Sequence, residues 1–386
     1  MLRFLTAGES HGPGLVTIVE GLPKGLRFST ESLAHELARR RLGHGRGARM
    51  KIEADRLEVV GGIRHGRTLG SPVAVVIRNS EAEKWARPMS IEAPEEPVAR
   101  VSRPRPGHAD FPGMIKYETD DIRDVLERAS ARETAARTVA GYLARELLGA
   151  LEIHIRSHVV AIGPIEAESA WSTLSDFDGV DEDPVRCLDR QASARMVALI
   201  DQVEADKDTL GGLVEVLGFG LPIGLGSYVH YDRRLDGLLA QAVMSIPAMK
   251  GVEIGDGFRV AGLPGSVSHD EIFPGDGTVE RETNRAGGLE GGITNGEVLR
   301  VRAAMKPIST LMRPLATVDM DTGEEASAVR ERSDVCAVPA AAVVAEQMVS
   351  WVIANEVTRK FGGDTMDDLQ RNVDSYRGRV RARLTR

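Results

Sequence analysis

One six-residue turn occurs twice in this chain and constrains the fold more than any other feature. Residues 21–26 read Gly-Leu-Pro-Lys-Gly-Leu, and residues 220–225 read Gly-Leu-Pro-Ile-Gly-Leu. Each copy follows a strand-like run and precedes a helical pattern, so the repetition predicts two structurally similar halves. A turn composition shared by chance is the alternative, because the repeated segment is short.

Hydrophobic periodicity predicts a mixture of strands and helices around these turns. Short apolar or alternating runs predict strands at 14–20, 57–61, 73–77, 153–162, 213–218 and 258–261. Helical spacing predicts helices at 30–41, 121–148, 189–203, 234–244, 340–360 and 366–383. Residues 81–110 are rich in Pro, Glu and Arg and follow neither period, which predicts a long loop of the kind that often acts as a functional lid.

The bulk composition is typical of a large globular protein. A chain of 386 residues with 42% hydrophobic residues can bury a substantial core, which excludes general disorder. Two cysteines are too few for a disulfide framework and suit a reducing cytoplasm. We recognise neither an apolar run of transmembrane length nor a secretory signal, so we expect a soluble, cytoplasmic protein with no membrane partner.

The net charge of -8 is unevenly distributed along the chain. Basic residues outnumber acidic ones up to residue 149, whereas the remainder is acidic. This asymmetry favours a focused pocket for a small anion over nucleic-acid binding, although arginines scattered over a solvated surface would give the same count. The aromatic content of 4% also argues against a single-strand nucleic-acid platform, which relies on base stacking.

A serine and a histidine stand between glycines in the segment Gly-Glu-Ser-His-Gly at 8–12. A hydroxyl, an imidazole and exposed backbone amides within five residues predict chemistry on a polar or anionic group. The same segment fits the nucleophile elbow of α/β-hydrolases, but only one short strand can precede Ser10, which disfavours that interpretation. A glycine turn with a solvated His11 is the plainer alternative.

Arginines and glycines alternate after the helix predicted at 30–41. Arg40, Arg46 and Arg49 are candidates for anion recognition, because planar guanidinium groups suit phosphate or carboxylate and glycines let the backbone approach a ligand. The loop 43–48 also satisfies the relaxed dinucleotide fingerprint. That fingerprint needs a strand before it and a helix after it, whereas here a helix precedes and a basic strand follows.

Two further clusters lie in the middle of the first part. At the proline-rich end of the predicted loop, Arg105 stands beside His108, whose imidazole could act as an acid or base; a solvent-exposed histidine is the alternative. On the helix predicted at 121–148, Arg128 and Arg132 are four residues apart and would share one face, with small residues between them leaving room for a flat ligand.

The last candidate residues lie near the C-terminus. Residues 306–310 read Lys-Pro-Ile-Ser-Thr and offer a cation and hydroxyls to a phosphate. Asp334 stands where the apolar helix begins. It could therefore be the N-cap of that helix or a catalytic residue, and the sequence alone favours neither role. Cys336 is predicted to be a small packing residue. No Cys or His grouping has zinc spacing and no Walker or EF-hand pattern is found, so we expect no tightly bound metal.

Taken together, these segments resemble the chorismate synthase family over nearly the whole chain. Three family signatures are matched in order: Gly-Glu-Ser-His-Gly with the first Gly-Leu-Pro turn, Arg-Ala-Ser-Ala-Arg-Glu-Thr at 128–134, and Arg-Ser-Asp-Val-Cys-Ala-Val-Pro-Ala at 332–340. The resemblance implies a lyase that converts 5-enolpyruvylshikimate 3-phosphate into chorismate by anti 1,4-elimination of phosphate and a ring proton, in the shikimate pathway of aromatic amino-acid biosynthesis.

The resemblance also implies a fold and a cofactor. The fold would be α+β, a β-α-β-α sandwich with an internal pseudo-repeat. It would form a single domain over 1–386, with two pseudo-repeated halves and a C-terminal helical segment that begins near 334. The resemblance also implies that four copies assemble into a homotetramer. Reduced FMN would be required although the reaction has no net redox change. No reductase domain is recognised, so NADPH would act only indirectly through an external flavin reductase. A flavin- or NAD(P)-dependent oxidoreductase acting on a small anionic substrate is the main alternative.

Each candidate residue receives a role from this resemblance. His11 would be the general acid for the departing phosphate, His108 would stabilise or protonate the reduced flavin, and Ser10 would orient a ligand. Asp334 and Ser130 would help to deprotonate the flavin N5. The implied substrate-binding cations are Arg40, Arg46, Arg49, Arg105, Arg132 and Arg332. The implied flavin contacts are Arg128, Ala129, Ser130, Pro247, Ala248, Gly291, Lys306, Pro307, Ile308, Ser309, Thr310 and Arg332. Related chains often have a polar residue in place of Pro247, so only a backbone contact is expected there.

Overall fold

The first sheet is formed by the N-terminal part of the chain. The structure is a computed structural model that describes residues 1–47, 55–168, 171–275, 279–331 and 333–385. Four antiparallel strands lie in the order β1-β2-β6-β3. Their bounds are Arg3–Gly8 (β1), Gly14–Glu20 (β2), Arg56–Gly61 (β3) and Val73–Arg78 (β6). Alternation buries Leu15, Val19 and Val75 on the face toward the helices and leaves the opposite face more exposed.

The second sheet has five antiparallel strands in the order β10-β15-β9-β7-β8. Their bounds are His154–Ile162 (β7), Ile165–Glu166 (β8), Gly212–Phe219 (β9), Met249–Ile254 (β10) and Leu299–Met305 (β15). From Ser157 onward, every residue of β7 is buried. This strand is therefore covered on both faces of the sheet.

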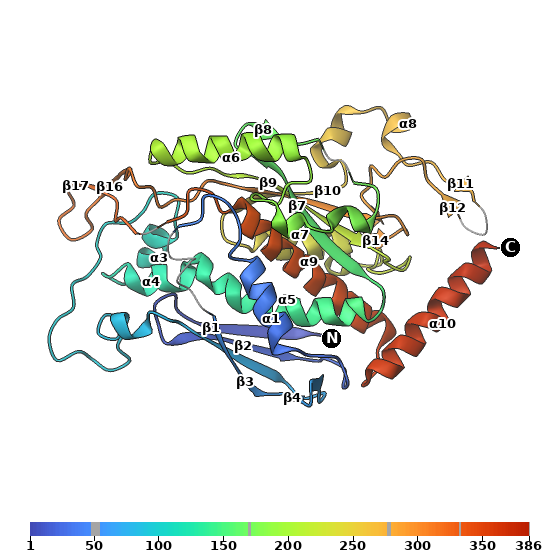
Figure 1. Cartoon of the computed structure of the whole chain (residues 1–386), viewed down its shortest axis with the longest axis horizontal. Helices are drawn as coiled ribbons and strands as arrows, with labels where there is room; N and C mark the ends of the chain where they lie inside the picture. Colours follow the sequence, from blue (N-terminus) through green and yellow to red (C-terminus); the bar gives the residue numbers. More distant parts are fainter. Residues whose placement is uncertain (48–54, 169–170, 276–278, 332, 386) are drawn as a thin grey trace.

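Helices fill the space between the two sheets (Figure 1). Helix α5 (Thr134–Gly149) packs on the first sheet, α9 (Val338–Phe361) packs on β7 and β9, and the two helices pack on each other. Helix α6 (Arg190–Ala205) lies beyond the second sheet, which completes the predicted β-α-β-α sandwich. Although α9 is long and apolar enough to resemble a membrane span, it is almost entirely buried inside the protein.

The repeated turn occupies equivalent places in the two halves. Its first copy joins β2 to α1 (Thr30–Arg39), and its second joins β9 to α7 (Leu235–Met244). The hydroxyl of Thr68 accepts a hydrogen bond from the amide of the turn's last leucine at 2.9 Å and donates to the proline carbonyl at 2.6 Å. Thr294 makes the same two bonds in the second copy, at 2.8 and 2.7 Å. Matching bonds at matching positions confirm the pseudo-repeat.

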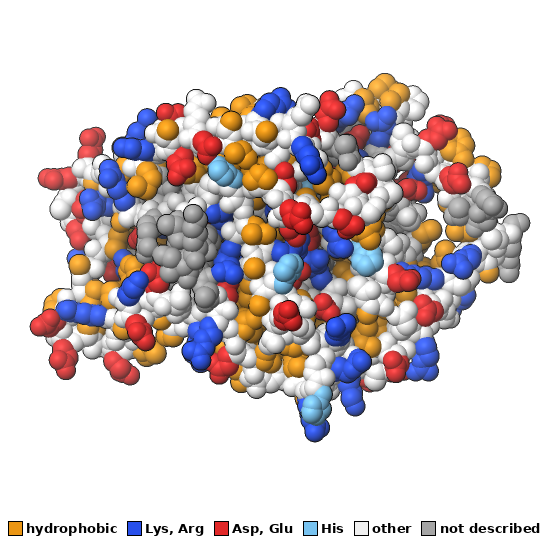
Figure 2. All heavy atoms as spheres, in the orientation of Figure 1, with side chains coloured by type: hydrophobic (Ala, Val, Ile, Leu, Met, Phe, Trp, Pro, Cys, Tyr) orange, Lys and Arg blue, Asp and Glu red, His pale blue; other side chains and the backbone are white. Residues whose placement is uncertain are grey.

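Further elements, most of them short, surround this framework. Among the described residues they are η1 (Ala82–Trp85), α3 (Asp110–Tyr117), α4 (Arg123–Ala129), η2 (Ala131–Glu133), η3 (Leu174–Phe177), η4 (Val180–Glu182), η5 (Tyr231–Arg233), η6 (Gly257–Gly262), α8 (Gly265–Ser268) and α10 (Met366–Leu384). Two-stranded ribbons pair β4 (Ile63–Arg64) with β5 (Arg67–Thr68), β11 (Phe273–Pro274) with β12 (Val279–Glu280), β13 (Leu289–Glu290) with β14 (Ile293–Thr294), and β16 (Ala316–Val318) with β17 (Glu325–Ser327). Acidic and basic side chains are interspersed over the face shown in Figure 2.

Two predicted elements are wrong. Residues 258–261 form part of the 3-10 helix η6 instead of a strand, and Phe258, 82% exposed, does not pack into the core as a strand residue would. The helix predicted at 121–148 is interrupted at Ser130, where the backbone is extended. Strand β15 was not predicted, although its buried Leu299 and Val301 alternate with arginines as in a half-buried strand.

Candidate active site

A cavity of about 750 Å³ is lined by segments from both halves of the chain. The predicted site residues that line it are Ser10, His11, Arg40, Arg46, Arg105, His108, Ala129, Ser130, Arg132, Pro247, Ala248, Lys306, Pro307, Ile308, Ser309, Thr310 and Asp334. Arg128 and Gly291 are not among the residues that line it. Arg49 and Arg332 lie outside the described residues. Residues from distant parts of the sequence therefore meet around one volume of the size usual for ligand sites.

The interruption at Ser130 explains how the second signature contributes to the cavity. The Ser130 hydroxyl accepts a hydrogen bond from the amide of Arg132 at 3.2 Å, as an N-cap does for the helical turn that follows. Arg132 then lines the cavity, whereas Arg128 donates to the Thr6 hydroxyl at 2.8 Å and fixes β1. The prediction that both arginines share one helix face is wrong, because a continuous helix would be needed for it.

The surroundings of Ser10 exclude a nucleophile elbow. Strand β1 runs antiparallel to β2, and β2 follows the turn directly, whereas the elbow requires a strand-to-helix turn in a parallel sheet. The Ser10 hydroxyl lies 3.3 Å from the hydroxyl of Ser130, and the amide of Ser10 donates to the Glu127 carbonyl at 3.0 Å. Ser10 thus joins the N-terminal turn to the end of α4 at the wall of the cavity.

His11 is a buried side chain held by a carboxylate and an indole. Its Nδ1 lies 2.9 Å from Oε1 of Glu127, and its backbone amide donates to Oε2 of the same carboxylate at 2.8 Å. Trp85 packs against the imidazole with ring centroids 4.1 Å apart. Burial would raise the pKa of Glu127, but the hydrogen bonds and charges of His11 and Arg123 hold it below its ordinary value. The partner of His11 is therefore an anion that accepts a hydrogen bond from Nδ1.

His108 is backed by a carboxylate in the same way. Its Nδ1 lies 2.5 Å from Oδ1 of Asp110, a fully buried residue. Arg105 donates to the same carboxylate through Nε at 2.8 Å and to the hydroxyl of Thr310 at 3.0 Å. Burial would raise the pKa of Asp110, but hydrogen bonds from His108 and Arg105 hold it well below its ordinary value. His108 is thus an oriented part of the cavity wall, not a solvated loop side chain.

Several arginines reach the cavity with little exposure to solvent. Arg40 is 4% exposed and contacts the Thr134 hydroxyl at 3.5 Å. Arg132 is 5% exposed and pairs with Asp55 at 2.7 Å. Burying a guanidinium group is costly unless negative charge compensates it. Asp55 supplies that charge to Arg132, and together the arginines present guanidinium donors to the cavity.

Asp334 binds the glycine loop and does not cap the apolar helix. Its Oδ1 accepts from the amide of Gly47 at 2.7 Å, and its Oδ2 pairs with Arg46 at 2.7 Å. The residue that precedes α9 is Ala337, so the N-cap interpretation is wrong. Gly45 in the same loop has a φ of +80°, and a Cβ there would lie 2.7 Å from a side-chain carbon of Ile200, so this position requires glycine.

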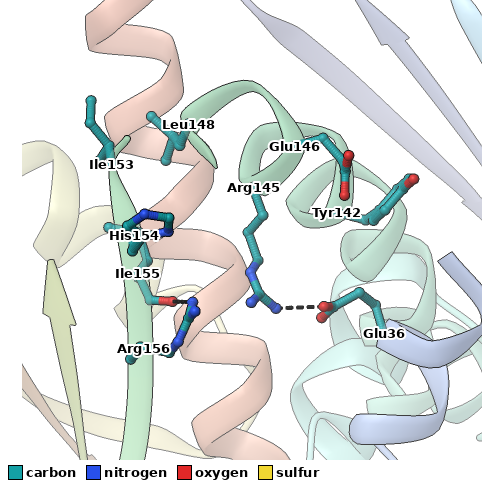
Figure 3. Close-up of a pocket in the computed structure, with 9 residues that line it drawn as sticks. All are labelled: Glu36, Tyr142, Arg145, Glu146, Leu148, Ile153, His154, Ile155 and Arg156. Atoms are coloured by element: carbon teal, nitrogen blue, oxygen red, sulfur yellow. Dashed lines mark hydrogen bonds and ion pairs between the residues drawn. The ribbon is translucent and has the colours of Figure 1, made fainter. Parts of the chain in front are cut away.

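A second cavity, of about 160 Å³, lies between α1, α5 and the start of β7 (Figure 3). Arg145 in its wall pairs with Glu36 at 2.6 Å and with the fully buried Glu346 at 2.9 Å. Arg156 donates to the carbonyl of Ile155 at 3.0 Å. Because charges of both signs line this volume and its arginines have protein partners, we assign it to the packing of the two halves.

Sequence reasoning missed the residues that hold the two histidines. Glu127 lies on the predicted helix, but the family motifs are matched by its neighbours and assign it no role. Asp110 stands two residues after His108, a spacing at which a carboxylate can reach an imidazole. Trp85 lies in the segment predicted as a loop. Its contact with His11 could not be predicted from the sequence, since the two residues are far apart in it.

A four-layer α+β fold with two carboxylate-backed imidazoles and buried arginines in one cavity defines an enzyme that acts on a small molecule. Comparison with known proteins agrees with this class. The sequence model of the family described as chorismate synthase matches residues 2–358. The chain belongs to the chorismate synthase family, and the enzyme is a lyase.

Individual relatives extend the similarity to nearly the full chain. A chorismate synthase of Parafrankia sp. is 58% identical, with 97% of this chain and 98% of that protein covered. A chorismate synthase of Nocardia farcinica is 56% identical, with coverage of 99% and 97%. A crystal structure of chorismate synthase superposes with a TM-score of 0.79 at 39% identity and covers 99% of this chain and 98% of its own.

Proposed function

We propose that this chain converts 5-enolpyruvylshikimate 3-phosphate into chorismate by anti 1,4-elimination, as the last common step of the shikimate pathway. The bond between carbon and the phosphate oxygen breaks, a ring proton leaves, and inorganic phosphate is the second product. The observation that carries the proposal is the cavity of about 750 Å³ that two imidazoles and several buried guanidinium groups line together. A substrate with one phosphate and two carboxylates matches that charge.

The arginines would bind the substrate. Arg40, Arg46, Arg105 and Arg132 line the cavity, and guanidinium groups can form paired hydrogen bonds with phosphate or carboxylate oxygens. Arg49 and Arg332 would complete this set. These charges would offset the cost of removing the substrate's phosphate and carboxylates from water.

His11 would protonate the departing phosphate. Negative charge grows on the bridging oxygen as the bond breaks, and a protonated imidazole can neutralise it. Glu127 accepts a hydrogen bond from Nδ1, so Nε2 is the atom that would give the proton. Ser10 would orient the ligand, since its hydroxyl already interacts with Ser130 on the same wall.

The residues around the cavity also fit reduced FMN. Ala337, Ala340 and Ala341 form a small, apolar surface, while Lys306 and its neighbouring hydroxyl residues could hold a phosphate. Burial and the nearby Lys250 lower the pKa of Lys306, because both disfavour its charged form, and a phosphate beside it would offset that effect. Bound reduced FMN would supply electron density to the substrate ring without net oxidation.

Individual side chains would have separate roles toward the flavin. His108 would donate a hydrogen bond to the reduced ring system, and Asp334 with Ser130 would help to remove a proton from it. The further cavity residues proposed to contact the flavin are Ala129, Pro247, Ala248, Pro307, Ile308, Ser309 and Thr310, together with Arg332. Arg128 would act through β1, whose Thr6 it binds.

We further propose a homotetramer in the cytoplasm that depends on an external flavin reductant, with NADPH used only by that reductant. Apolar side chains on the outer face of the first sheet, including Leu5 at 64% and Val60 at 64% exposure, support association with other copies. Gly291 lies outside this chain's cavity, and a Cβ added there would lie 4.0 Å from the Cβ of Tyr228, a residue that is 73% exposed. A flavin contact at Gly291 would therefore be made with the flavin of a neighbouring subunit.

Anaerobic turnover tests the proposed function. The purified protein is mixed with photoreduced FMN and 5-enolpyruvylshikimate 3-phosphate, and chorismate and inorganic phosphate are measured. Equal amounts of the two products are expected. Substrate that remains intact in the presence of bound reduced FMN would reject the proposal.

A further inference from the structure

Glu127 is bound to the N-terminal turn by both its backbone and its side chain. Its carbonyl accepts from the amide of Ser10 at 3.0 Å, and its carboxylate accepts from the amide of His11 at 2.8 Å. The side chain is 1% exposed, so no solvent competes for these bonds. The turn that carries His11 is thus fixed to the end of α4 through one residue.

The same carboxylate also determines which edge of the imidazole faces it. Nδ1 of His11 lies 2.9 Å from Oε1 and 3.0 Å from Oε2 of Glu127. A carboxylate only accepts hydrogen bonds, so Nδ1 must carry a proton. Chemistry at a ring oriented in this way takes place at Nε2, on the opposite edge.

Two further contacts keep this arrangement in place. Arg123 donates to Oε1 of Glu127 at 3.0 Å and holds the carboxylate from the preceding turn of α4. The guanidinium of Arg123 also lies 4.9 Å from the ring centroid of Trp85, which in turn packs on His11. The imidazole is therefore restrained in its plane by Glu127 and across its face by Trp85.

We propose that Glu127 is a positioning residue that keeps a proton on Nδ1 of His11, so that the proton given to the leaving phosphate comes from Nε2 and the ring ends as the neutral Nδ1-protonated form. The inference rests on the proposed function, because it explains the orientation of the His11 ring by the proton transfer to phosphate in that reaction. It concerns a residue that would touch neither substrate nor flavin, and that acts through the histidine alone.

The test compares Glu127→Gln with wild type in two measurements. Histidines labelled with ¹⁵N report the tautomer by NMR, and the His11 signal is assigned from its loss in His11→Ala. The amide of Gln can donate to Nδ1, so the variant should lose the Nδ1-protonated signature. In steady-state assays with reduced FMN, kcat should fall roughly 100-fold while KM changes little, because proton transfer and not binding is impaired.

Two variants serve as controls. Glu127→Asp keeps a carboxylate, so it should keep the tautomer signature and recover part of the lost kcat; it also preserves the test if Glu127→Gln fails to fold. Glu133→Gln removes a nearby carboxylate that pairs with Arg137 at 2.8 Å and should leave both measurements unchanged. A wild-type tautomer or wild-type kcat in Glu127→Gln would overturn the proposal. Absence of chorismate with wild type itself would instead reject the proposed function.

Discussion

Oδ1 of Asp110 lies 2.5 Å from Nδ1 of His108, and the carboxylate of Asp110 also accepts two hydrogen bonds from the side chain of Arg105. One buried carboxylate therefore orients an imidazole and a guanidinium group on the same cavity wall. Loss of its charge would affect both stability and chemistry, since the buried guanidinium group of Arg105 would remain without its anionic partner.

Asp110→Asn should accordingly lower the free energy of unfolding by about 3–5 kcal/mol, the usual cost of breaking a buried pair. Turnover should fall as well, because asparagine has one uncharged acceptor oxygen in place of two and cannot accept from both His108 and Arg105 as the carboxylate does. Urea unfolding and kcat are the measurements. Asp120→Asn is the control, since Asp120 pairs with Arg100 through a side chain that is 83% exposed. Equal effects of the two substitutions would contradict the role of Asp110.

His11→Ala and His108→Ala should each lower kcat by roughly 10²- to 10⁴-fold, as removal of a general acid or base does. The far-UV circular dichroism spectrum should stay that of the wild type, because neither side chain lies in a helix or strand. Near-normal turnover in either variant would remove that histidine from its proposed role.

Asp334→Asn should retain FMN binding and slow turnover. The asparagine oxygen can still accept from the amide of Gly47, whereas the ion pair with Arg46 is lost. Because Asp334 does not cap α9, the variant should fold normally. Fluorescence titration of FMN and steady-state kinetics separate the two effects, and an unfolded variant would contradict this account.

Glu215→Gln tests acid stability at a site away from the cavity. Glu215 is fully buried and accepts from His158 at 3.1 Å and Arg302 at 2.9 Å. Burial would raise its pKa, but His158, Arg302 and Arg300 lower the pKa of Glu215 to about 2 from an ordinary value of 4.5. The ionised Glu215 carboxylate therefore stabilises the fold fully at a pH above its ordinary pKa. This stabilisation is lost as the pH falls toward the lowered pKa of the folded state. The difference in unfolding free energy between variant and wild type should narrow from pH 7 to pH 3, and a constant difference would argue against this pairing.

Helices and strands were predicted correctly where the spacing of apolar residues in the sequence matches the faces that are buried in the fold. Strand β2 was predicted at its observed bounds because its apolar side chains alternate, and α9 was recognised because it is apolar on every side. The interruption at Ser130 was missed because helical periodicity continues across it. There the local hydrogen bond of Ser130 to Arg132 prevails over the helix propensity of the surrounding residues.

The candidate site was predicted residue by residue but not as a geometry. A family motif contains His11, whereas His108, Arg40, Arg46 and Arg105 were singled out from the glycine-rich and proline-rich loops, and the fold brings all of these into one cavity. The carboxylates behind the two imidazoles were missed. For Glu127 the contact depends on how α4 meets the N-terminal turn, which is a tertiary relationship with no signal in the local sequence.

The ratio of chorismate formed to flavin oxidised tests the central claim most directly. Limiting photoreduced FMN is supplied anaerobically with excess 5-enolpyruvylshikimate 3-phosphate, and chorismate and flavin absorbance are followed together. The account predicts many molecules of chorismate for each FMN while the flavin stays reduced. Oxidation of one flavin for each substrate consumed would contradict it and would indicate an oxidoreductase.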